Sequence, residues 1–334
     1  MIFGAVFLCS GLRILTLFCA DLYVCSSKEF GYNVVKGVSF MLMRRKRQEL
    51  LNHVYFIGPA TICLLLIIVI PFVMGGYYSL TSWNGISGDK SWVGLGNYIK
   101  ILTEDTQFFN SFKFTLLFTS VALVITNVLA FVLALGLTQA LKMVGLLRAS
   151  FFIPNVLGGI LLGFIWRFIF TNSFADIGDL TGIRFFGLQW LGTSSTGFWA
   201  MIIVFTWLIT GYLMVIYVTA LQGVDQSVLE AAKIDGSNYM QTLFRIVVPL
   251  IVPAFTICLF LSLSIAFKVF DLNLALTNGG PFNSTQMVAH NIYVEAFQKN
   301  RFGSGSAKAF IFFIAVALLS VTQVMLTKKK EVSM

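Results

Sequence analysis

Charged residues are scarce in this sequence, where they make up 11% of 334 residues; soluble domains carry about 25%. Hydrophobic residues reach 57% and gather in runs long enough to cross a hydrocarbon core, which takes about 20 helical residues. The net charge of +9 does not indicate nucleic-acid binding, because the basic residues cluster at the ends of apolar runs, as at 44–47 and 328–330. We therefore expect lipid to surround most of the chain.

Patterns that would hold a metal, a disulfide framework or ATP are also missing. The five cysteines show no C-x-x-C spacing, and His53 and His290 have no metal-ligand neighbours in sequence. No G-x-x-x-x-G-K-[ST] occurs, so the chain cannot cradle ATP phosphates by that route. No Ser/His/Asp, Cys/His or paired-carboxylate constellation indicates catalysis. We expect a non-catalytic chain with no metal and no cofactor of its own.

Six apolar runs predict six membrane-spanning helices and an all-α polytopic fold. They cover about residues 54–80, 114–141, 151–170, 198–221, 249–270 and 309–326. Pro71 is expected to kink the first helix, and Gly158, Gly159 and Gly163 are expected to allow close helix packing in the third. The sequence thus predicts an extension at 1–43, a six-span domain at 44–330 and a tail at 331–334.

The extension at 1–43 has three interpretations. Its first part, residues 1–23, is apolar but interrupted by Arg13 and lacks a basic start, so it makes a poor signal peptide. An extra span is the second interpretation. We favour the third, in which translation begins at Met41 or Met43, because residues 36–41 can be encoded by a purine-rich ribosome-binding sequence followed by a start codon.

The distribution of basic residues predicts how the spans are oriented. One set of loops is short and dense in positive charge, namely Arg44–Arg47, Lys142, Arg148, Lys233, Arg245 and Lys328–Lys330. The other set is longer and carries Lys90, Lys100, Lys113, Arg184, Lys299, Arg301 and Lys308. Because short basic loops stay in the cytoplasm, we expect both termini of the six-span core and residues 222–248 to be cytoplasmic.

Residues 222–248, the coupling loop, form a rare polar interval between two apolar runs. Ser227-x-x-Glu230 matches a capping box, with Asp225 as a competing cap, and Gly236 suits the left-handed position that ends a helix. Ser237 is expected to cap a second helix running through Ile246. The pattern predicts a helix, a turn and a helix outside the bilayer.

One face of the first helix combines small and charged residues: Val228, Ala231, Ala232 and Asp235. Small side chains allow another protein to approach the backbone closely. The alternative is an amphipathic helix on the membrane surface, which would need more basic residues and larger apolar anchors. We therefore interpret the coupling loop as a protein docking element.

The coupling loop resembles the signature of permease subunits of binding-protein-dependent ABC importers. The matching residues are Glu230-Ala231-Ala232, Asp235-Gly236-Ser237, Phe244, Ile246, Pro249 and Pro253. Further matches are Val93-Gly94-Leu95-x-Asn97-Tyr98, Phe152-x-Pro154, Gly211-Tyr212-x-Met214 and Phe267-Lys268-Val269-Phe270-Asp271 before Leu276-Thr277-x-Gly279-Gly280-Pro281. The last is similar to the first permease of the maltose, multiple-sugar and glycerol-3-phosphate branch. Ser237 and Val248 depart from the usual alanine and leucine.

The resemblance implies a type I importer fold whose coupling helix sits in a cytoplasmic ATPase. It implies a second permease subunit, two ATPase subunits that bind ATP and Mg, an extracellular or periplasmic solute-binding protein, and a bacterial or archaeal cytoplasmic membrane. A sugar or sugar derivative is the implied cargo. The rivals are an ABC permease for another solute and an ion-coupled secondary carrier; acidic residues after Met41 fall in loops or at predicted helix ends, which disfavours the carrier.

The substrate pathway is predicted from residue type alone. Charged residues inside spans are functional candidates, and Arg167 and Lys268 qualify, although both lie towards helix ends where they can snorkel to water. Aromatic and hydrogen-bonding side chains suit a sugar, and for each of them helix packing or lipid contact is the competing interpretation. Besides Lys268, the candidates are Asn127, Trp166, Trp207, Tyr212, Tyr217, Ser262, Ser264 and Asn273.

Overall fold

The computed structural model describes residues 55–139 and 143–328. The chain divides into two compact units, residues 1–72 and 73–334, and each is described by itself. In the first unit the described residues are helical, with a π-helical turn η1 (Leu65–Val69). The expectations for residues 1–43, the basic cluster at 44–47 and the tail at 331–334 lie outside the described residues.

The described part of the second unit is built from helices, with one isolated antiparallel bridge between Thr81 and Trp92. The longer helices are α3 (Ile70–Ser79, continuing from the first unit), α4 (Gly96–Glu104), α5 (Thr106–Leu137), α6 (Val144–Leu157), α7 (Gly159–Phe168), α9 (Ser194–Gln222), α10 (Gln226–Ile234), α13 (Val252–Phe267) and α16 (Phe302–Lys328). The shorter ones are η2 (Ile169–Ser173), α8 (Phe174–Thr181), α11 (Tyr239–Thr242), η3 (Leu243–Val247), α12 (Val248–Leu250), α14 (Asp271–Leu276), α15 (Val288–Tyr293) and η4 (Val294–Gln298).

Within the described residues, five helices have the length and apolar composition to cross a membrane, and a bent pair raises the number to six. The five are Tyr55–Ser79, Thr106–Leu137, Gly159–Thr181, Ser194–Gln222 and Phe302–Lys328. The bent pair joins Tyr239–Leu250 to Val252–Phe267 at 68°. The count of six predicted from the sequence is reached when this pair is taken as one span.

The third predicted span, 151–170, is wrong in its boundaries. Gly158 adopts φ 79° and ψ 157°, which breaks the helix between α6 and α7. The apolar stretch then continues through η2 and α8 to Thr181, inside what the sequence predicted as a loop. Because the backbone of Gly158 leaves the helical region, α6 and α7 are separate helices. Hydropathy does not register such a break, and the sequence therefore predicted a single span.

The core of the second unit lies where α5, α9 and α13 pack together, with α6 and α7 against them. Phe118 on α5 and Phe205 on α9 are fully buried, and their rings meet edge to face with centroids 5.4 Å apart. Glycines permit the closest approaches, since a Cβ at Gly211 of α9 would overlap the carbonyl oxygen of Phe151 on α6. Gly163 of α7 likewise leaves room for Ala275 of α14.

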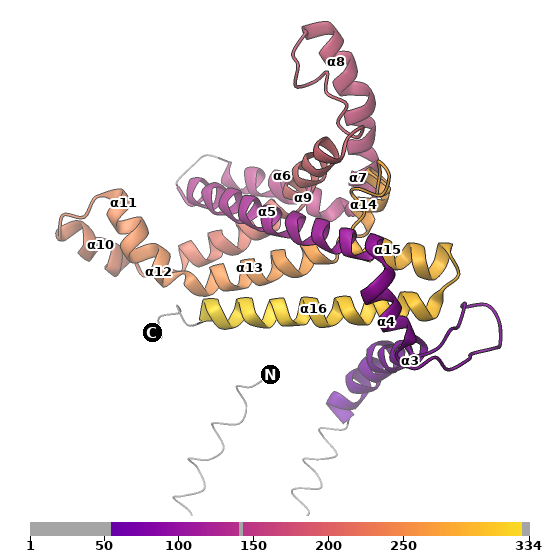
Figure 1. Ribbon diagram of the computed structural model, residues 1–334. Coiled ribbons are helices and arrows are strands. Elements are labelled where there is room, and N and C mark those ends of the chain that lie inside the picture. The colour runs from indigo at the N-terminus through magenta and orange to yellow at the C-terminus, as the bar shows by residue number, and fades with distance from the viewer. Residues whose placement is uncertain (1–54, 140–142, 329–334) are drawn as a thin grey trace, which may run out of the picture. The chain divides into compact units, whose positions relative to one another are not determined.

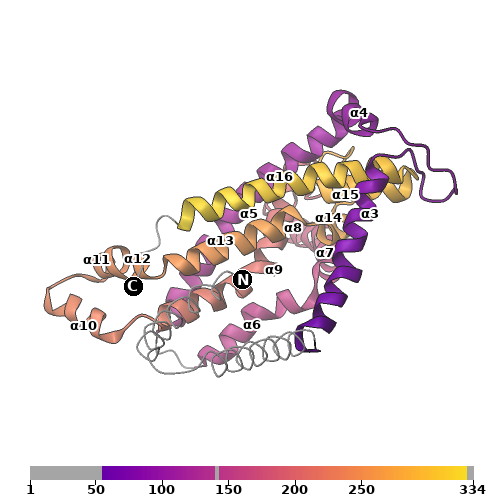
Figure 2. The ribbon, with the colours of Figure 1, turned by 90° about the horizontal axis from the view of Figure 1, so that it is seen from below.

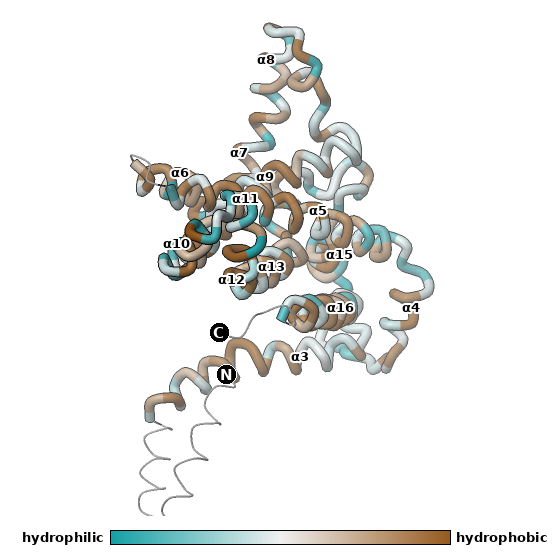
Figure 3. The backbone as a smooth tube through the Cα atoms, turned by 90° about the vertical axis from the view of Figure 1, so that its left-hand side faces the viewer, coloured by the Kyte–Doolittle hydropathy of each residue, from teal (hydrophilic) through white to brown (hydrophobic). Residues whose placement is uncertain are grey.

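The helices divide the second unit into two ends (Figures 1 and 2). At the coupling end, α9 finishes, α10 to α12 follow, and α13 begins; at the opposite end, α5, α9 and α16 begin. Arg148 on α6 donates to the carbonyl of Leu137 at 2.9 Å, which joins the end of α5 to the start of α6. Figure 3 shows much of α9 and α13 as hydrophobic, with hydrophilic residues along α10 and α11.

Candidate functional site

The first helix of the coupling loop is α10, and its start follows the competing cap. Asp225 has extended backbone angles, and its carboxylate accepts a hydrogen bond from the amide of Ser227 at 2.9 Å. This backbone hydrogen bond lowers the pKa of Asp225. The predicted Ser227–Glu230 box therefore does not form the cap, because the side chain one residue outside the helix already satisfies the free amide.

The turn after α10 forms as predicted at Gly236 but differs at Ser237. Gly236 has φ 78°, the left-handed conformation that glycine adopts without strain. The Ser237 hydroxyl donates to the carbonyl of Ala232 at 2.7 Å and so closes the end of α10. Asn238, one residue later, caps α11 through a reciprocal box with Gln241, which corrects the predicted role of Ser237.

The coupling loop exposes a mixed apolar and acidic surface. Ala232 is buried, whereas Glu230, Ala231 and Asp235 are exposed. Larger apolar side chains flank them, with Ile234 86% exposed and Tyr239, Met240 and Phe244 also exposed. Such a surface on a helix that packs little against its own chain suits a protein partner.

Two predicted pathway residues, Asn127 and Tyr217, meet inside the core and not at a surface. The Tyr217 hydroxyl donates to Asn127 Oδ1 at 2.9 Å, and Asn127 Nδ2 donates to Ser262 Oγ at 2.9 Å. Asn127 is 6% exposed and Tyr217 is 0% exposed. The three side chains link α5, α9 and α13 across their apolar packing, so the structure favours a role in holding these helices together.

Asn273, another predicted pathway residue, is fully buried at the opposite end. Its amide donates to Thr285 O at 2.8 Å, and its carbonyl oxygen accepts from the amide of Met287 at 3.1 Å. His290 Nδ1 lies 3.0 Å from the same oxygen, and burial lowers the pKa of His290. Asn273 therefore fixes the chain between α14 and α15.

The remaining predicted pathway residues are more accessible. Trp166 on α7 meets Trp207 on α9 edge to face at 5.5 Å, and the buried Trp166 Nε1 has no hydrogen-bond partner. Trp207 and Lys268 are exposed, while Tyr212 and Ser264 are half-buried. Lys268 lines a cavity of about 280 Å³ with Gly159, Phe205, Leu208, Ile265, Val269, Phe270, Asp271 and Leu272. Arg167 is exposed on α7.

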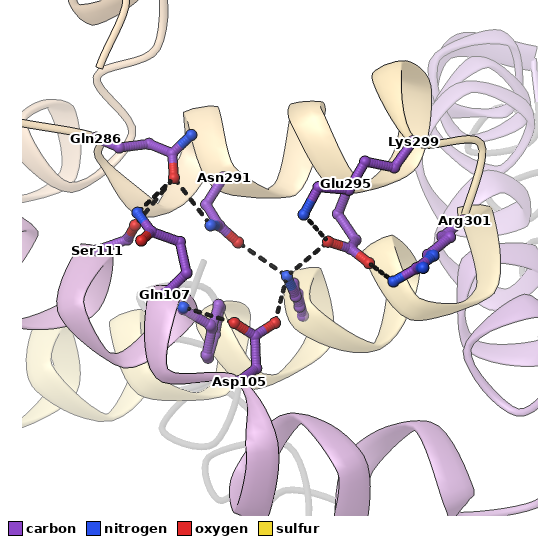
Figure 4. A network of polar contacts seen from close by, with 10 residues as sticks. Asp105, Gln107, Ser111, Gln286, Asn291, Glu295, Lys299 and Arg301 are labelled. Carbon is purple, nitrogen blue, oxygen red and sulfur yellow. Dashed lines mark hydrogen bonds and ion pairs between the residues drawn. The ribbon is translucent and has the colours of Figure 1, made fainter. Parts of the chain in front are cut away.

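A buried ion-pair network that the sequence analysis missed lies at the opposite end (Figure 4). Lys308 of α16 is 1% exposed, although the sequence placed it in an outer loop. Its ammonium group lies 2.7 Å from Asp105 Oδ2 and 3.1 Å from Glu295 Oε2, and it donates to Asn291 Oδ1 at 3.0 Å. Three acceptors match the three N–H bonds of a lysine. A lysine between two alanines at the start of an apolar run was the available signal.

The network lowers the pKa of both carboxyl groups. Burial raises the pKa of Asp105, but hydrogen bonds from Lys308 and from the amide of Phe108 outweigh it. Burial also raises the pKa of Glu295, and the nearby charge of Lys308 with the hydrogen bond from Lys299 outweighs that effect. Both groups are therefore held ionised, which a buried ammonium group requires. Among the described residues, no three His, Cys, Asp or Glu side chains group as a metal site.

Residues 142–331 match the profile of a family described as the inner membrane component of binding-protein-dependent transport systems. The permease protein AmyD of Thermoanaerobacterium thermosulfurigenes, named for a probable starch degradation products transport system, is 44% identical over 87% of this chain and 100% of its own length. MsmF of Streptococcus mutans, from a multiple sugar-binding transport system, is 34% identical over 78% of this chain and 90% of its own.

Solved structures share the fold. A bacterial ABC transporter that imports the acidic polysaccharide alginate aligns with a TM-score of 0.74 at 16% identity, covering 86% of this chain and 98% of that one. The same kind of transporter in complex with an alginate-pentasaccharide-bound periplasmic protein aligns at 0.69 with 18% identity, covering 84% and 93%. The predicted importer-permease fold is thereby confirmed.

Proposed function

Because the chain belongs to the family of inner membrane components of binding-protein-dependent transport systems, we propose that it passes a sugar or sugar derivative across the bacterial or archaeal cytoplasmic membrane. The observation that carries the proposal is the 44% identity to AmyD along that protein's whole length, with MsmF as a second carbohydrate-system relative. Products of starch degradation are accordingly the first substrates to test.

Transport is driven by ATP that partner subunits hydrolyse. The proposed assembly contains this chain, a second permease of similar fold, two cytoplasmic ATPase subunits that hold ATP and Mg, and a solute-binding protein. This chain has no phosphate-binding loop of the G-x-x-x-x-G-K-[ST] type. Its coupling loop presents Glu230, Ala231 and Asp235 on and beside the exposed helix α10, which ends at Ile234 and is followed by the turn at Gly236 and Ser237. This surface is suited to a groove in one of the two ATPase subunits.

The 68° bend at Ile251 joins that surface to a span. Residues 239–250 form a helical arm in which η3 is a π-helical turn, and α13 follows directly. Because no flexible linker intervenes, a movement of the docked loop would be passed to α13 and through Ser262 to the buried Asn127 and Tyr217. We place the sugar's path beside Trp166, Trp207, Tyr212, Ser264 and Lys268, the more accessible candidates.

The test is uptake by the reconstituted complex. The two permeases, the ATPases and the binding protein in liposomes are expected to import labelled maltodextrins only with ATP inside, and this chain alone is expected to show no ATP hydrolysis. Import driven by a proton or sodium gradient without the ATPases would contradict the proposal. ATP-dependent transport of a different class of solute by the same complex would support the coupling scheme but refute the proposal that the substrate is a sugar.

The orientation has a separate test. On a background without native cysteines, Ser237→Cys should react with a membrane-impermeant maleimide only in inside-out vesicles, because the coupling loop is proposed to face the cytoplasm. A cysteine at Asn283, at the opposite end, should react only in right-side-out vesicles. Labelling in the reverse sense at both positions would invert the assignment.

A further inference from the structure

Helix α4 carries a stripe of apolar side chains that are exposed in the described part of the chain. Leu95, Ile99 and Leu102 are 64%, 61% and 55% exposed, and their spacing of four and three residues sets them on one side of the helix. Trp92, just before the helix, is 62% exposed. We call Trp92, Leu95, Ile99 and Leu102 the α4 stripe. A contiguous exposed apolar surface marks contact with a partner or with a membrane.

The other two sides of α4 have different surroundings. Ile101, which is 2% exposed, packs in a small hydrophobic core with Tyr98 partly buried against it. Lys100 and Glu104 are exposed and line a polar cavity of about 660 Å³, which Arg301 also lines. The helix therefore has one side against protein, one polar side and one apolar side, which is the division expected of a helix at a membrane surface.

Both ends of α4 are joined to membrane-spanning helices. Near its start, Asn97 Nδ2 donates to the carbonyl oxygens of Ser79 and Thr81, both at 2.8 Å. At its end, Asp105 accepts a hydrogen bond from the amide of Phe108 at 2.8 Å and so caps α5. Ser79 is the last residue of one candidate span, and α5 is the next candidate span. Helix α4 therefore lies at the level where one span leaves the membrane and the next enters it.

The direction of α4 follows from a break in the helix at Asp105. This residue has φ −87° and ψ 76°, outside the helical region, so α4 and α5 are separate helices. Figures 1 and 3 show α4 running across the direction of α5. Because α5 crosses the membrane, α4 runs along the membrane surface.

The α4 stripe continues the exposed apolar surface of α3. The ring centroids of Tyr77 on α3 and Trp92 in the stripe lie 6.1 Å apart, and Val73 and Met74, one turn earlier on α3, are also exposed. Because α3 is the end of a candidate span, this surface is suited to hydrocarbon. Tyrosine and tryptophan favour the level of the lipid headgroups. The α4 stripe thus begins where the apolar surface of the span ends.

We propose that α4 lies in the lipid–water interface at the end opposite the coupling loop, with the α4 stripe in the boundary between headgroups and acyl chains. The partner is the phospholipid surface, because the stripe continues the apolar surface of a span and lies at the level where two spans meet water. The charged side of the helix, with Lys100 and Glu104, then faces water. This inference goes beyond the proposed function, since it holds for any solute that the transporter carries.

The test measures how deeply spin labels on α4 lie in the membrane, in the complete transporter reconstituted in nanodiscs of phosphatidylethanolamine and phosphatidylglycerol. Oxygen concentrates in lipid and a nickel chelate stays in water, so the two relaxing agents report opposite environments. On a background without native cysteines, a label at Ile99→Cys should be relaxed more by oxygen and should lie about 5–10 Å into the headgroup and acyl boundary. Leu102→Cys should give the same depth, which keeps the test decisive if the first variant assembles poorly.

Two control labels separate membrane contact from apolar character and from position along the chain. Thr103→Cys lies on the polar side of the same helix, and Ile86→Cys replaces an apolar side chain that is 76% exposed in the loop before α4. Both labels should be relaxed more by the nickel chelate than by oxygen. The same result at Ile99 would overturn the proposal, because the stripe would then face water. Protection of the Ile99 label from both agents would also overturn it, because a protein subunit would then cover the stripe.

Discussion

The two ends of the second unit differ in how their polar residues are satisfied. At the coupling end, Asp225, Ser237 and Asn238 bond to nearby backbone, and the remaining surface is exposed. At the opposite end, Lys308 of α16, Glu295 of η4, Asn291 of α15 and Asp105, the cap of α5, are joined to one another. Local capping builds a helix that needs no neighbours, whereas a buried network ties neighbours into one body. The coupling end is therefore built from local contacts, and the opposite end from contacts between separate elements.

Distorting the turn at the coupling end should abolish uptake completely. Gly236→Val forces a β-branched residue into the left-handed conformation at φ 78°, and Glu230→Lys reverses an exposed charge. Membrane insertion should be normal in both variants, while co-purification of the ATPase and uptake should fall to background.

Two controls separate this effect from damage to the loop in general. Gly236→Asn should retain uptake, because asparagine tolerates the left-handed region. Gly223→Ala, at a glycine with ordinary φ −81°, should also retain it. Wild-type uptake in both Gly236→Val and Glu230→Lys would remove the docking role from the coupling loop.

Breaking the ion-pair network at the opposite end should cause a large loss of stability. Lys308→Met leaves the buried carboxylate of Glu295 and the half-buried carboxylate of Asp105 without their ammonium group, a change that costs about 3–5 kcal/mol. A drop in the thermal unfolding midpoint of the purified protein in detergent measures it. Lys299→Met, which removes a half-exposed partner of the same Glu295, should cost at most about 1 kcal/mol. Equal effects of the two substitutions would argue against the buried character of Lys308.

Tyr217→Phe should produce a smaller loss of stability. It removes the hydroxyl that donates to Asn127 and leaves a buried oxygen unsatisfied, which costs about 1–3 kcal/mol. The exposed Tyr239→Phe is the matched control and should unfold like the wild type. If Tyr217→Phe abolishes uptake at full stability, the hydroxyl serves the transport path and not helix packing.

The smallest expected effect is the pH dependence of the network. The pKa values of Asp105 and Glu295 are held below their ordinary values of 3.8 and 4.5. A depressed carboxyl pKa contributes stability that is fully present above the ordinary value and is lost as the pH falls through the depressed one. The unfolding midpoint should therefore fall as the pH drops below about 4.5, and Lys308→Met should show a shallower fall. An equally steep fall in the variant would contradict this assignment.

Local chemistry explains which features the sequence could predict. Hydropathy predicted where most of the apolar helices lie, and Gly236 predicted the turn after α10, because both depend on nearby residues. The break at Gly158 was missed, since nothing in its neighbours distinguishes a bent glycine from a packed one. Lys308 was misplaced because its partners lie 13 and more residues away along the chain, so its burial depends on tertiary contacts. Asn127 and Tyr217 were chosen by residue type, and only the packing shows that they face each other.

The tight contact between Gly211 and the carbonyl of Phe151 limits which substitutions position 211 can accept. Every side chain other than hydrogen would place a Cβ into that backbone oxygen, and a backbone cannot rotate aside as a flexible side chain can. The spacing of α6 and α9 at this point therefore depends on a single glycine. In a library of variants selected for uptake, position 211 should show almost no diversity, whereas position 212 should tolerate more substitutions. The short distance between α6 and α9 would then be visible as the absence of accepted substitutions at one position.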